Sequence, residues 1–144
     1  MNDLLIRIKA IIDKEVPLIS NLSNVASLLN ELDNINWCGF YLANDDYLYL
    51  GPFQGEVACT IIPFTKGVCG KCYQEKKTVI VDNVLTFPGH IACSSASRSE
   101  IVTPIIKDNK VVALIDIDAP IFSRFSNKEK ELLEEVAAFL KDLF

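Results

Sequence analysis

Residues 99–118 decide the fold of this chain, and they read SEIVTPIIKDNKVVALIDID. Two apolar runs rich in β-branched residues, 101–106 and 111–117, flank the polar tetrad 107–110. Strand-forming runs on either side of a short Asp/Asn turn predict an antiparallel hairpin. The rest of the chain can be placed around this hairpin.

Three acids fall on what should be one surface of the hairpin. Because side chains alternate between the faces of a strand, the first strand presents Glu100, Val102 and Pro104 together, and the second presents Val112, Leu114, Asp116 and Asp118 together. Acids on an otherwise apolar face are unfavourable unless that end opens into a polar site. The alternative is a frayed strand whose Asp residues cap a turn before Pro120.

The flanking segments predict an α+β domain. Apolar spacing predicts helices over 4–12 and 19–32, a short helix over 68–75, and a last helix that starts at a capping box over 126–129. Strand patterns cover 37–43, 47–50, 58–63 and 78–81. We expect one domain over 1–144, with helices in 1–33, and with the sheet, the loops and the last helix in 35–144. The helices pack on one face, and the long loop 82–99 covers a pocket on the other.

Composition excludes several classes of function. The chain has 144 residues, half of them hydrophobic, and a net charge of −5, which argues against disorder and against nucleic-acid binding. No apolar run reaches membrane-spanning length, and residues 1–3 do not begin a signal-peptide pattern. We therefore expect a cytoplasmic protein with no membrane and no nucleic-acid partner.

Five cysteines are an excess for a protein in a reducing compartment, although any one of them alone can simply be a small buried apolar residue. They are Cys38, Cys59, Cys69, Cys72 and Cys93. Their number is odd and their spacing is not that of a disulfide scaffold, which favours metal binding, catalysis or redox cycling. Cys38 is predicted to lie in the core. The last four could in principle bind zinc, but their spacing fits no common zinc finger.

Two aromatic residues and one histidine complete the candidate site. Trp37 and Tyr41 share a strand face, where they form either an aromatic wall with polar tips or ordinary core. His90, the only histidine, stands three residues before Cys93. A catalytic Cys-His pair is one interpretation, and a loop histidine bonded to backbone is the other.

Taken together, these segments resemble one family, the GAF-domain free methionine-(R)-sulfoxide reductases. The similar stretches are NWCGFYL (36–42), LGPFQG (50–55), AC (58–59), GVCG (67–70), GHIAC (89–93), SEIV (99–102), DID (116–118) and FSRF (122–125). The three-cysteine spacing and the HIAC loop separate this family from GAF domains that only bind ligands.

The resemblance implies a six-stranded antiparallel GAF sheet and reduction of free L-methionine (R)-sulfoxide. It implies a thioredoxin-type reductant and a homodimer. Its catalytic residues are Cys93 as nucleophile, Cys59 as resolving cysteine, Cys69 as a second exchanging cysteine, and the acids Glu100 and Asp118. Asp116 joins these acids in binding substrate, and Trp37 and Tyr41 form the aromatic pocket. Cys72, Cys38 and Ser94 depart from the family pattern.

The chemistry expected of this site needs no metal and no organic cofactor. Neighbouring carboxylates raise one another's pKa, so a protonated Glu100 or Asp118 can act as general acid on the sulfoxide oxygen. Backbone N–H groups of the loop from Ser94 to Ser99 are expected to hold the substrate carboxylate. The competing hypothesis is a non-catalytic GAF module that binds or senses a small ligand, since a fold alone does not define a reaction.

Overall fold

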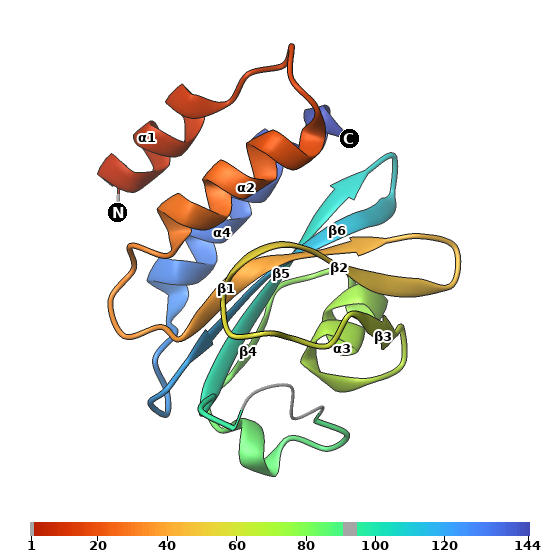
Figure 1. The fold of residues 1–144 in the computed structure, drawn as a ribbon. Helices are drawn as coiled ribbons and strands as arrows, with labels where there is room; N and C mark the ends of the chain where they lie inside the picture. Colours follow the sequence, from red (N-terminus) through yellow and green to blue (C-terminus); the bar gives the residue numbers. More distant parts are fainter. Residues whose placement is uncertain (1, 91–94) are drawn as a thin grey trace.

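The computed structural model describes residues 2–90 and 95–144, which form four helices, two short 3-10 turns and six strands (Figure 1). The helices are α1 Asn2–Ile11, α2 Leu18–Leu29, α3 Gly67–Glu75 and α4 Asn127–Leu140, and the 3-10 turns are η1 Val84–Thr86 and η2 Lys141–Leu143. The strands are β1 Trp37–Ala43, β2 Tyr47–Gly55, β3 Ile61–Pro63, β4 Val79–Val81, β5 Ser99–Lys107 and β6 Lys110–Ala119.

All six strands form one antiparallel sheet in the order β3-β2-β1-β6-β5-β4, which confirms the predicted fold class. The hairpin β5–β6 lies near the middle of this sheet. It closes through Asp108 and Asn109, both with positive φ. Such a two-residue turn matches the right-handed twist of the strands. The turn sets Lys107 opposite Lys110, and a one-residue irregularity between Ile105 and Ile106 then shifts the register so that Glu100 lies opposite Asp118.

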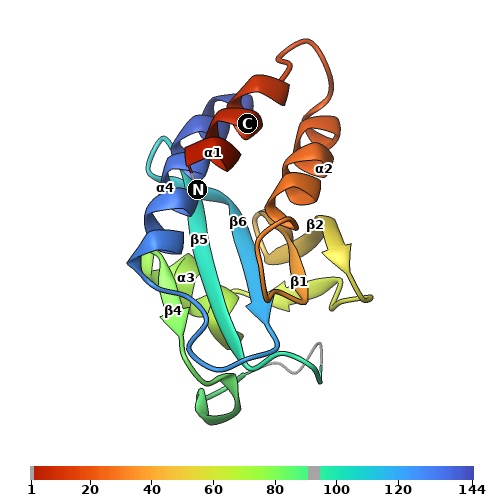
Figure 2. The same ribbon diagram turned by 90° about the vertical axis from the view of Figure 1, so that its left-hand side faces the viewer.

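Helices α1, α2 and α4 gather on one side of the sheet (Figures 1 and 2). Their apolar faces bury Leu22, Leu29 and Leu133 against Phe40 and Ile115 of the sheet. Cys38 lies in this core, as predicted, and its Sγ donates to the carbonyl of Ala26 at 3.2 Å. Burial raises the pKa of the Cys38 thiol to about 12, so it stays protonated.

The opposite side of the sheet carries α3 and a second apolar cluster. Val68, Cys69 and Cys72 of α3 pack against Val102 and Leu114 of the hairpin. The helix prediction over 68–75 is confirmed within a residue. This side holds the candidate site, because the acids of β5 and β6 face it.

Two β-bulges make the observed strands differ from the predicted ones, in the length of one strand and in the face on which one residue lies. The strand predicted to end at Leu50 continues to Gly55, because an irregular pairing opposite Phe40 accommodates Pro52 without a ladder N–H. A second irregularity leaves Val112 without a paired residue on β5. Val112 therefore packs on the helix side with Ala113, and its predicted grouping with Leu114 is wrong.

Two other boundaries also shift. The strand predicted over 58–63 begins only at Ile61, and the helix predicted to Leu32 ends at Leu29. Within the described residues, no helix is long and apolar enough to cross a membrane.

Candidate active site

Three acids converge on the α3 side of the sheet, the buried Glu100 and Asp116 and the half-buried Asp118. The hairpin pairs Glu100 with Asp118 and Val102 with Asp116, so the acids occupy neighbouring positions on one face. Glu100 is 6% exposed and Asp116 is 5% exposed. Glu100 forms side-chain hydrogen bonds with Asp116 and Asp118. The alternative of a frayed strand is wrong, because β6 stays paired to Ala119.

The acids hold protons more tightly than ordinary carboxyl groups. Burial, followed by the charges of Asp116 and Asp118, raises the pKa of Glu100 well above its usual range. Burial raises the pKa of Asp116 as well, and burial with the charge of Asp116 raises that of Asp118. The hydrogen bonds from Glu100 lower the pKa of both Asp residues and raise its own. The pattern favours Glu100 as the protonated member.

Helix α3 delivers Cys69 to this cluster. The helix begins at Gly67, whose φ of +67° suits glycine, and Cys69 follows in its first turn. Cys69 Sγ lies 3.5 Å from Asp116 Oδ2 and donates to it. Burial and the neighbouring acids raise the pKa of this thiol well above its usual range. Cys72 lies one turn further, where its Sγ donates to the carbonyl of Val102 at 3.5 Å.

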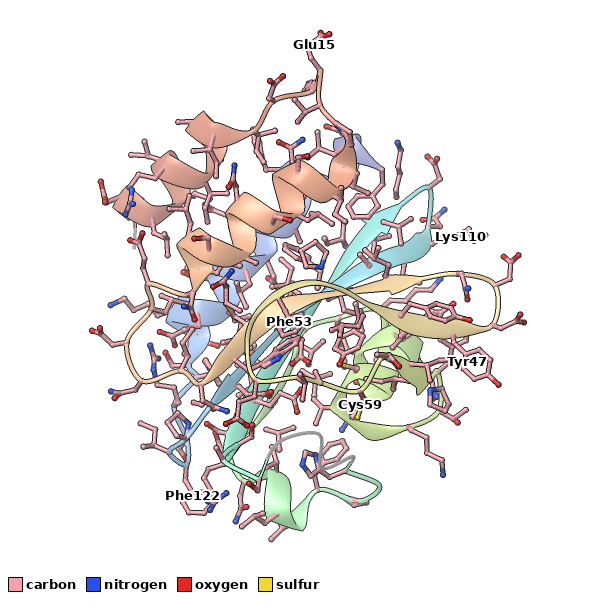
Figure 3. The ribbon with its side chains drawn as sticks, in the orientation of Figure 1. Glu15, Tyr47, Phe53, Cys59, Lys110 and Phe122 are labelled. Carbon is pink, nitrogen blue, oxygen red and sulfur yellow. The ribbon has the colours of Figure 1, made fainter. Side chains whose placement is uncertain are left out.

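An aromatic wall bounds the pocket on the β1–β2 side. The ring of Trp37 stacks on Phe53 at a centroid distance of 5.3 Å and on Tyr41 at 6.0 Å. The polar tips hold the segment after β2: Trp37 Nε1 donates to the carbonyl of Glu56 at 3.1 Å, and Tyr41 OH donates to that of Cys59 at 2.9 Å. Figure 3 labels Phe53 and Cys59 on this side. Trp37 and Tyr41 thus line the pocket and are at the same time members of the buried cluster on this side of the sheet.

The pocket between these groups encloses about 550 Å³ of space not filled by atoms, including its open mouth. That figure includes space open to solvent, and the cavity itself has a volume of about 40 Å³, which is small beside the roughly 300–1,000 Å³ of typical small-molecule pockets. It is lined by Trp37, Tyr41, Val57, Ala58, Ile62, Lys66, Gly67, Val68, Cys69, His90, Ser97, Glu100, Asp116 and Asp118. The structure thus brings together six of the residues predicted from sequence.

Some predicted site residues lie elsewhere or cannot be placed. Cys93 and Ser94 fall outside the described residues. Cys59 is half-buried beside the wall, next to the lining residue Ala58. His90 lines the pocket, and burial lowers its pKa, which favours the neutral imidazole.

Sequence reasoning missed Ser97, Phe53 and the start of α3. Ser97 precedes the predicted strand, Phe53 follows the Gly51-Pro52 pair that seemed to end one, and the α3 segment carries no pattern that points to a pocket. Phe53 and the start of α3 left a signal only as parts of the family-like stretches LGPFQG and GVCG.

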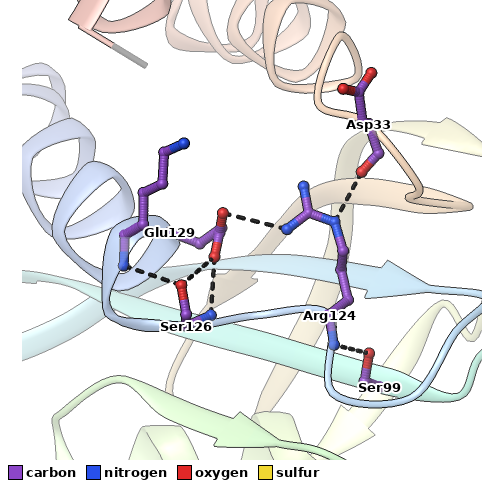
Figure 4. A network of polar contacts seen from close by, with 6 residues as sticks. Asp33, Ser99, Arg124, Ser126 and Glu129 are labelled. Atoms are coloured by element: carbon purple, nitrogen blue, oxygen red, sulfur yellow. Dashed lines mark hydrogen bonds and ion pairs between the residues drawn. The ribbon is translucent and has the colours of Figure 1, made fainter.

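A polar network behind the site fixes the entry to β5 (Figure 4). Ser99 Oγ donates to the carbonyl of Ile121 at 2.7 Å and accepts from Arg124 N at 3.3 Å. Arg124 Nε donates to the carbonyl of Asp33 at 2.8 Å, and its Nη1 lies 3.2 Å from Glu129 Oε2. The residue next to Glu100 is therefore tied to the loop before β1 and to α4.

One group of described residues has donors close enough to hold a metal ion. Ligand atoms of Cys69, Glu100 and Asp116 lie within 4.8 Å of one another. A structural zinc site requires four ligands, and this group shares only Cys69 with the four-cysteine set considered from sequence. Cys72 points away toward Val102. Cys69 and Glu100 both hydrogen-bond Asp116, which is the arrangement of a cluster that shares protons.

A model of the GAF domain family matches residues 17–141 of the chain. That match spans most of the sequence, and the chain belongs to the GAF domain family.

Within this family the chain is similar to proteins named free methionine-R-sulfoxide reductase. One, from Escherichia coli K12, is 42% identical over 133 residues, which cover 92% of this chain and 81% of the relative. A structure of the Neisseria meningitidis reductase in complex with its substrate matches with a TM-score of 0.94 and 39% identity, covering 99% of this chain and 87% of that one. A reduced form from Staphylococcus aureus, named fRMsr, gives a TM-score of 0.93 and 47% identity, covering 99% and 93%.

Proposed function

We propose that this chain is an oxidoreductase that reduces free L-methionine (R)-sulfoxide to L-methionine. As the sulfoxide is reduced, cysteine thiols of the enzyme are oxidised to a disulfide. The observation that carries the proposal is the buried acid cluster facing an aromatic-walled pocket. Such a cluster stores a proton at neutral pH, and a sulfoxide oxygen becomes a good leaving group only when it is protonated. The relatives named above support the same substrate.

The reaction uses thiols and the stored proton. A protonated Glu100 or Asp118 gives its proton to the sulfoxide oxygen while the Cys93 thiolate attacks sulfur. This attack forms an S–S bond to a substrate sulfur that still carries the hydroxyl group. The hydroxyl group then moves to Cys93 Sγ as the S–S bond breaks, so methionine leaves and Cys93 becomes a sulfenic acid. The Cys59 thiol condenses with that sulfenic acid, which forms a disulfide and releases water. A reduced dithiol protein then reopens the disulfide by exchange, and Cys69 can join this relay.

Features of the pocket favour a free amino acid over a peptide. Asp116 Oδ1 is buried and has no hydrogen-bond partner among the described residues, and it is suited to the substrate ammonium group. No described side chain caps α3, whose first residues Gly67 and Val68 line the same pocket. Uncapped N–H groups at a helix start attract a carboxylate. Asp116 Oδ1 and these N–H groups therefore give the pocket one polar group for each charged end of the substrate.

The aromatic wall suits the rest of the substrate. Trp37 and Tyr41 offer apolar faces to the methyl group and to sulfur, and sulfur–aromatic contacts are favourable. Their polar tips are already bonded to the 56–59 segment, so the rings face the pocket without an unpaired donor. In a peptide, the chain continues from both the amino and the carboxyl end of the methionine residue. The groups that bind these two ends leave no path for such a chain out of the pocket.

The central experiment is a thioredoxin-coupled assay with the separate R and S diastereomers of free methionine sulfoxide. Turnover of R alone supports the proposal. Equal turnover of peptide-bound sulfoxide contradicts the free substrate. Stable binding without turnover under reducing conditions favours a GAF binding module instead.

A cysteine series assigns the roles. Cys93→Ser should abolish even one turnover, whereas Cys59→Ser should release about one methionine per chain and then stall as a sulfenic acid. Cys38→Ser serves as the control, because that thiol faces the helical core. Retained turnover in Cys93→Ser would show that the nucleophile is another group.

We also expect a homodimer that works in the cytoplasm with a thioredoxin-type reductant. Light scattering of the purified chain at several concentrations tests the dimer. Replacing thioredoxin with glutaredoxin in the coupled assay tests the reductant.

A further inference from the structure

Ser97 lies in the pocket wall and has no role in the mechanism above. Its side chain is 5% exposed, and its hydroxyl hydrogen-bonds the carboxyl group of Asp118. Nδ2 of Asn36 lies 3.2 Å from Ser97 Oγ. The side chains of Asn36, Ser97 and Asp118 therefore form a continuous relay that ends in the pocket.

The chemistry of these groups gives the relay a direction. An amide NH₂ can only donate, so Ser97 accepts from Asn36. A hydroxyl carries a single proton, and that proton is left for Asp118. A carboxyl group that receives a donated proton is favoured in its ionised form. The relay thus acts on the charge of Asp118.

Backbone contacts hold both ends of the relay against the end of β6. The N–H of Asn36 donates to the carbonyl of Asp118 at 2.9 Å. The N–H of Arg98, next to Ser97, donates to the carbonyl of Ala119 at 2.7 Å, and the carbonyl of Arg98 accepts from Val84 at 2.9 Å. Because these bonds involve only backbone atoms, replacing a side chain of the relay leaves them in place.

Burial and the charge of Asp116 on β6 oppose the ionisation of Asp118. The acid Glu100 on β5, the thiols of Cys69 and Cys38, and the hydroxyl of Tyr41 also face the acid cluster, and the raised pKa values of the two thiols and of Tyr41 keep these three groups neutral. Lys66 and His90 are the basic residues among the lining residues, and His90 favours its neutral form. The donors that act on the Asp118 side chain are Glu100 and Ser97.

We propose that Ser97, oriented by Asn36, is a positioning residue that weakens the hold of Asp118 on a proton, so that the proton shared by the acid cluster favours Glu100 over Asp118. Glu100 is then the general acid, and Asp118 is the neighbour that accepts hydrogen bonds from Glu100 and Ser97. The catalytic consequence rests on the function proposed above. The effect on Asp118 itself rests on the geometry of the free protein.

The test measures the carboxyl titration of Asp118 by carbon-13 NMR in the substrate-free protein, with Asp118→Asn used to assign the signal. Ser97→Ala should raise the apparent pKa of Asp118 by about one unit. Asn36→Ala should shift it in the same direction by less, because Ser97 keeps its proton but loses its orientation. Ser97→Thr keeps the hydroxyl and should restore the wild-type titration.

Kinetics give the second readout. In Ser97→Ala the acid limb of the pH profile of kcat/KM should move to higher pH, by the same amount as the pKa measured by NMR. At a given pH on that limb, kcat/KM should therefore fall about tenfold. Thr103→Val is the matched control, because Thr103 is a buried hydroxyl on the other face of β5, bonded to Thr78. It should change neither readout.

Two results overturn the proposal: an unchanged Asp118 titration in Ser97→Ala, or a changed titration with an unchanged kinetic profile. A wild-type protein without turnover would instead refute the proposed function. The NMR comparison would then still decide whether Ser97 controls the charge of Asp118.

Discussion

The Sγ atom of Cys69 lies 3.5 Å from Oδ2 of Asp116, and the thiol donates to the carboxylate. In this arrangement Cys69 is a hydrogen-bond donor within the acid cluster. Its raised pKa keeps it protonated, and a thiol must become a thiolate to exchange disulfides. Cys69 therefore has to leave Asp116 before it can act in the proposed relay.

A pair of variants separates these two roles of Cys69. Cys69→Ser keeps a donor for Asp116, so we expect normal methionine release in the first turnover and slower thioredoxin-dependent cycling. Cys69→Ala also removes the donor, and KM should rise about fivefold, the equivalent of about 1 kcal/mol for a lost hydrogen bond. Single-turnover and steady-state assays measure both. Identical KM values in the two variants would show that the contact does not support substrate binding.

The acid cluster should make the protein less stable as pH rises. Burial raises the folded-state pKa of Glu100 and Asp118, so their contribution is fully present below the unfolded pKa and is lost as pH rises through the folded pKa. Urea unfolding between about pH 5 and pH 8 should show this decline. Asp118→Asn should flatten it and stabilise the protein at the alkaline end. A less stable Asp118→Asn at that end would contradict the assignment.

Glu129 should have the opposite pH dependence. Burial alone would raise its pKa, but hydrogen bonds from Ser126 and Arg124 outweigh burial and lower it. Its contribution is present above the unfolded pKa and is lost as pH falls through the folded value. At neutral pH, Glu129→Ala removes the capping box and the Arg124 contact, with an expected loss of about 2 kcal/mol in unfolding free energy.

The control for that prediction is Glu131→Ala on the exposed face of the same helix, which should change stability little. Equal losses for the two variants would mean that the network of Figure 4 adds nothing to helix propensity.

Gly39 allows β1 to lie close to Phe53 of β2. A Cβ at this position would lie 2.4 Å from Cβ of Phe53 and 2.8 Å from its Cα. Gly39→Ala should therefore destabilise the fold by about 1–3 kcal/mol. It should also raise KM, because Phe53 stacks on Trp37. In Gly51→Ala the nearest atom lies at 3.2 Å, so both effects should be smaller. Thermal unfolding and steady-state kinetics measure the comparison.

Most of the fold could be predicted because the signals are local. The apolar runs beside the 107–110 turn defined the central hairpin, and the capping box at Ser126 defined the start of α4. The bulges at Pro52 and Val112 could not be predicted, because they depend on how a neighbouring strand pairs. The face of Val112 was wrong for that reason.

Most of the candidate site followed from strand alternation. Glu100, Asp116 and Asp118 share a face because side chains alternate, and Trp37 and Tyr41 share one for the same reason. Ser97 and Asn36 had no such signal, since both lie just outside strands.

The sequence by itself determined which residue types meet: the hairpin pattern puts three acids on one face, and the cysteine spacing indicates sulfur chemistry. Only the tertiary structure decided which of these groups hold a proton. Burial beneath α3 raised the pKa values of the acids, and contacts with Ser97 and Cys69 distinguished one acid from another. The physical reason is that desolvation and hydrogen-bond direction depend on every packed neighbour, whereas alternation depends only on the strand itself.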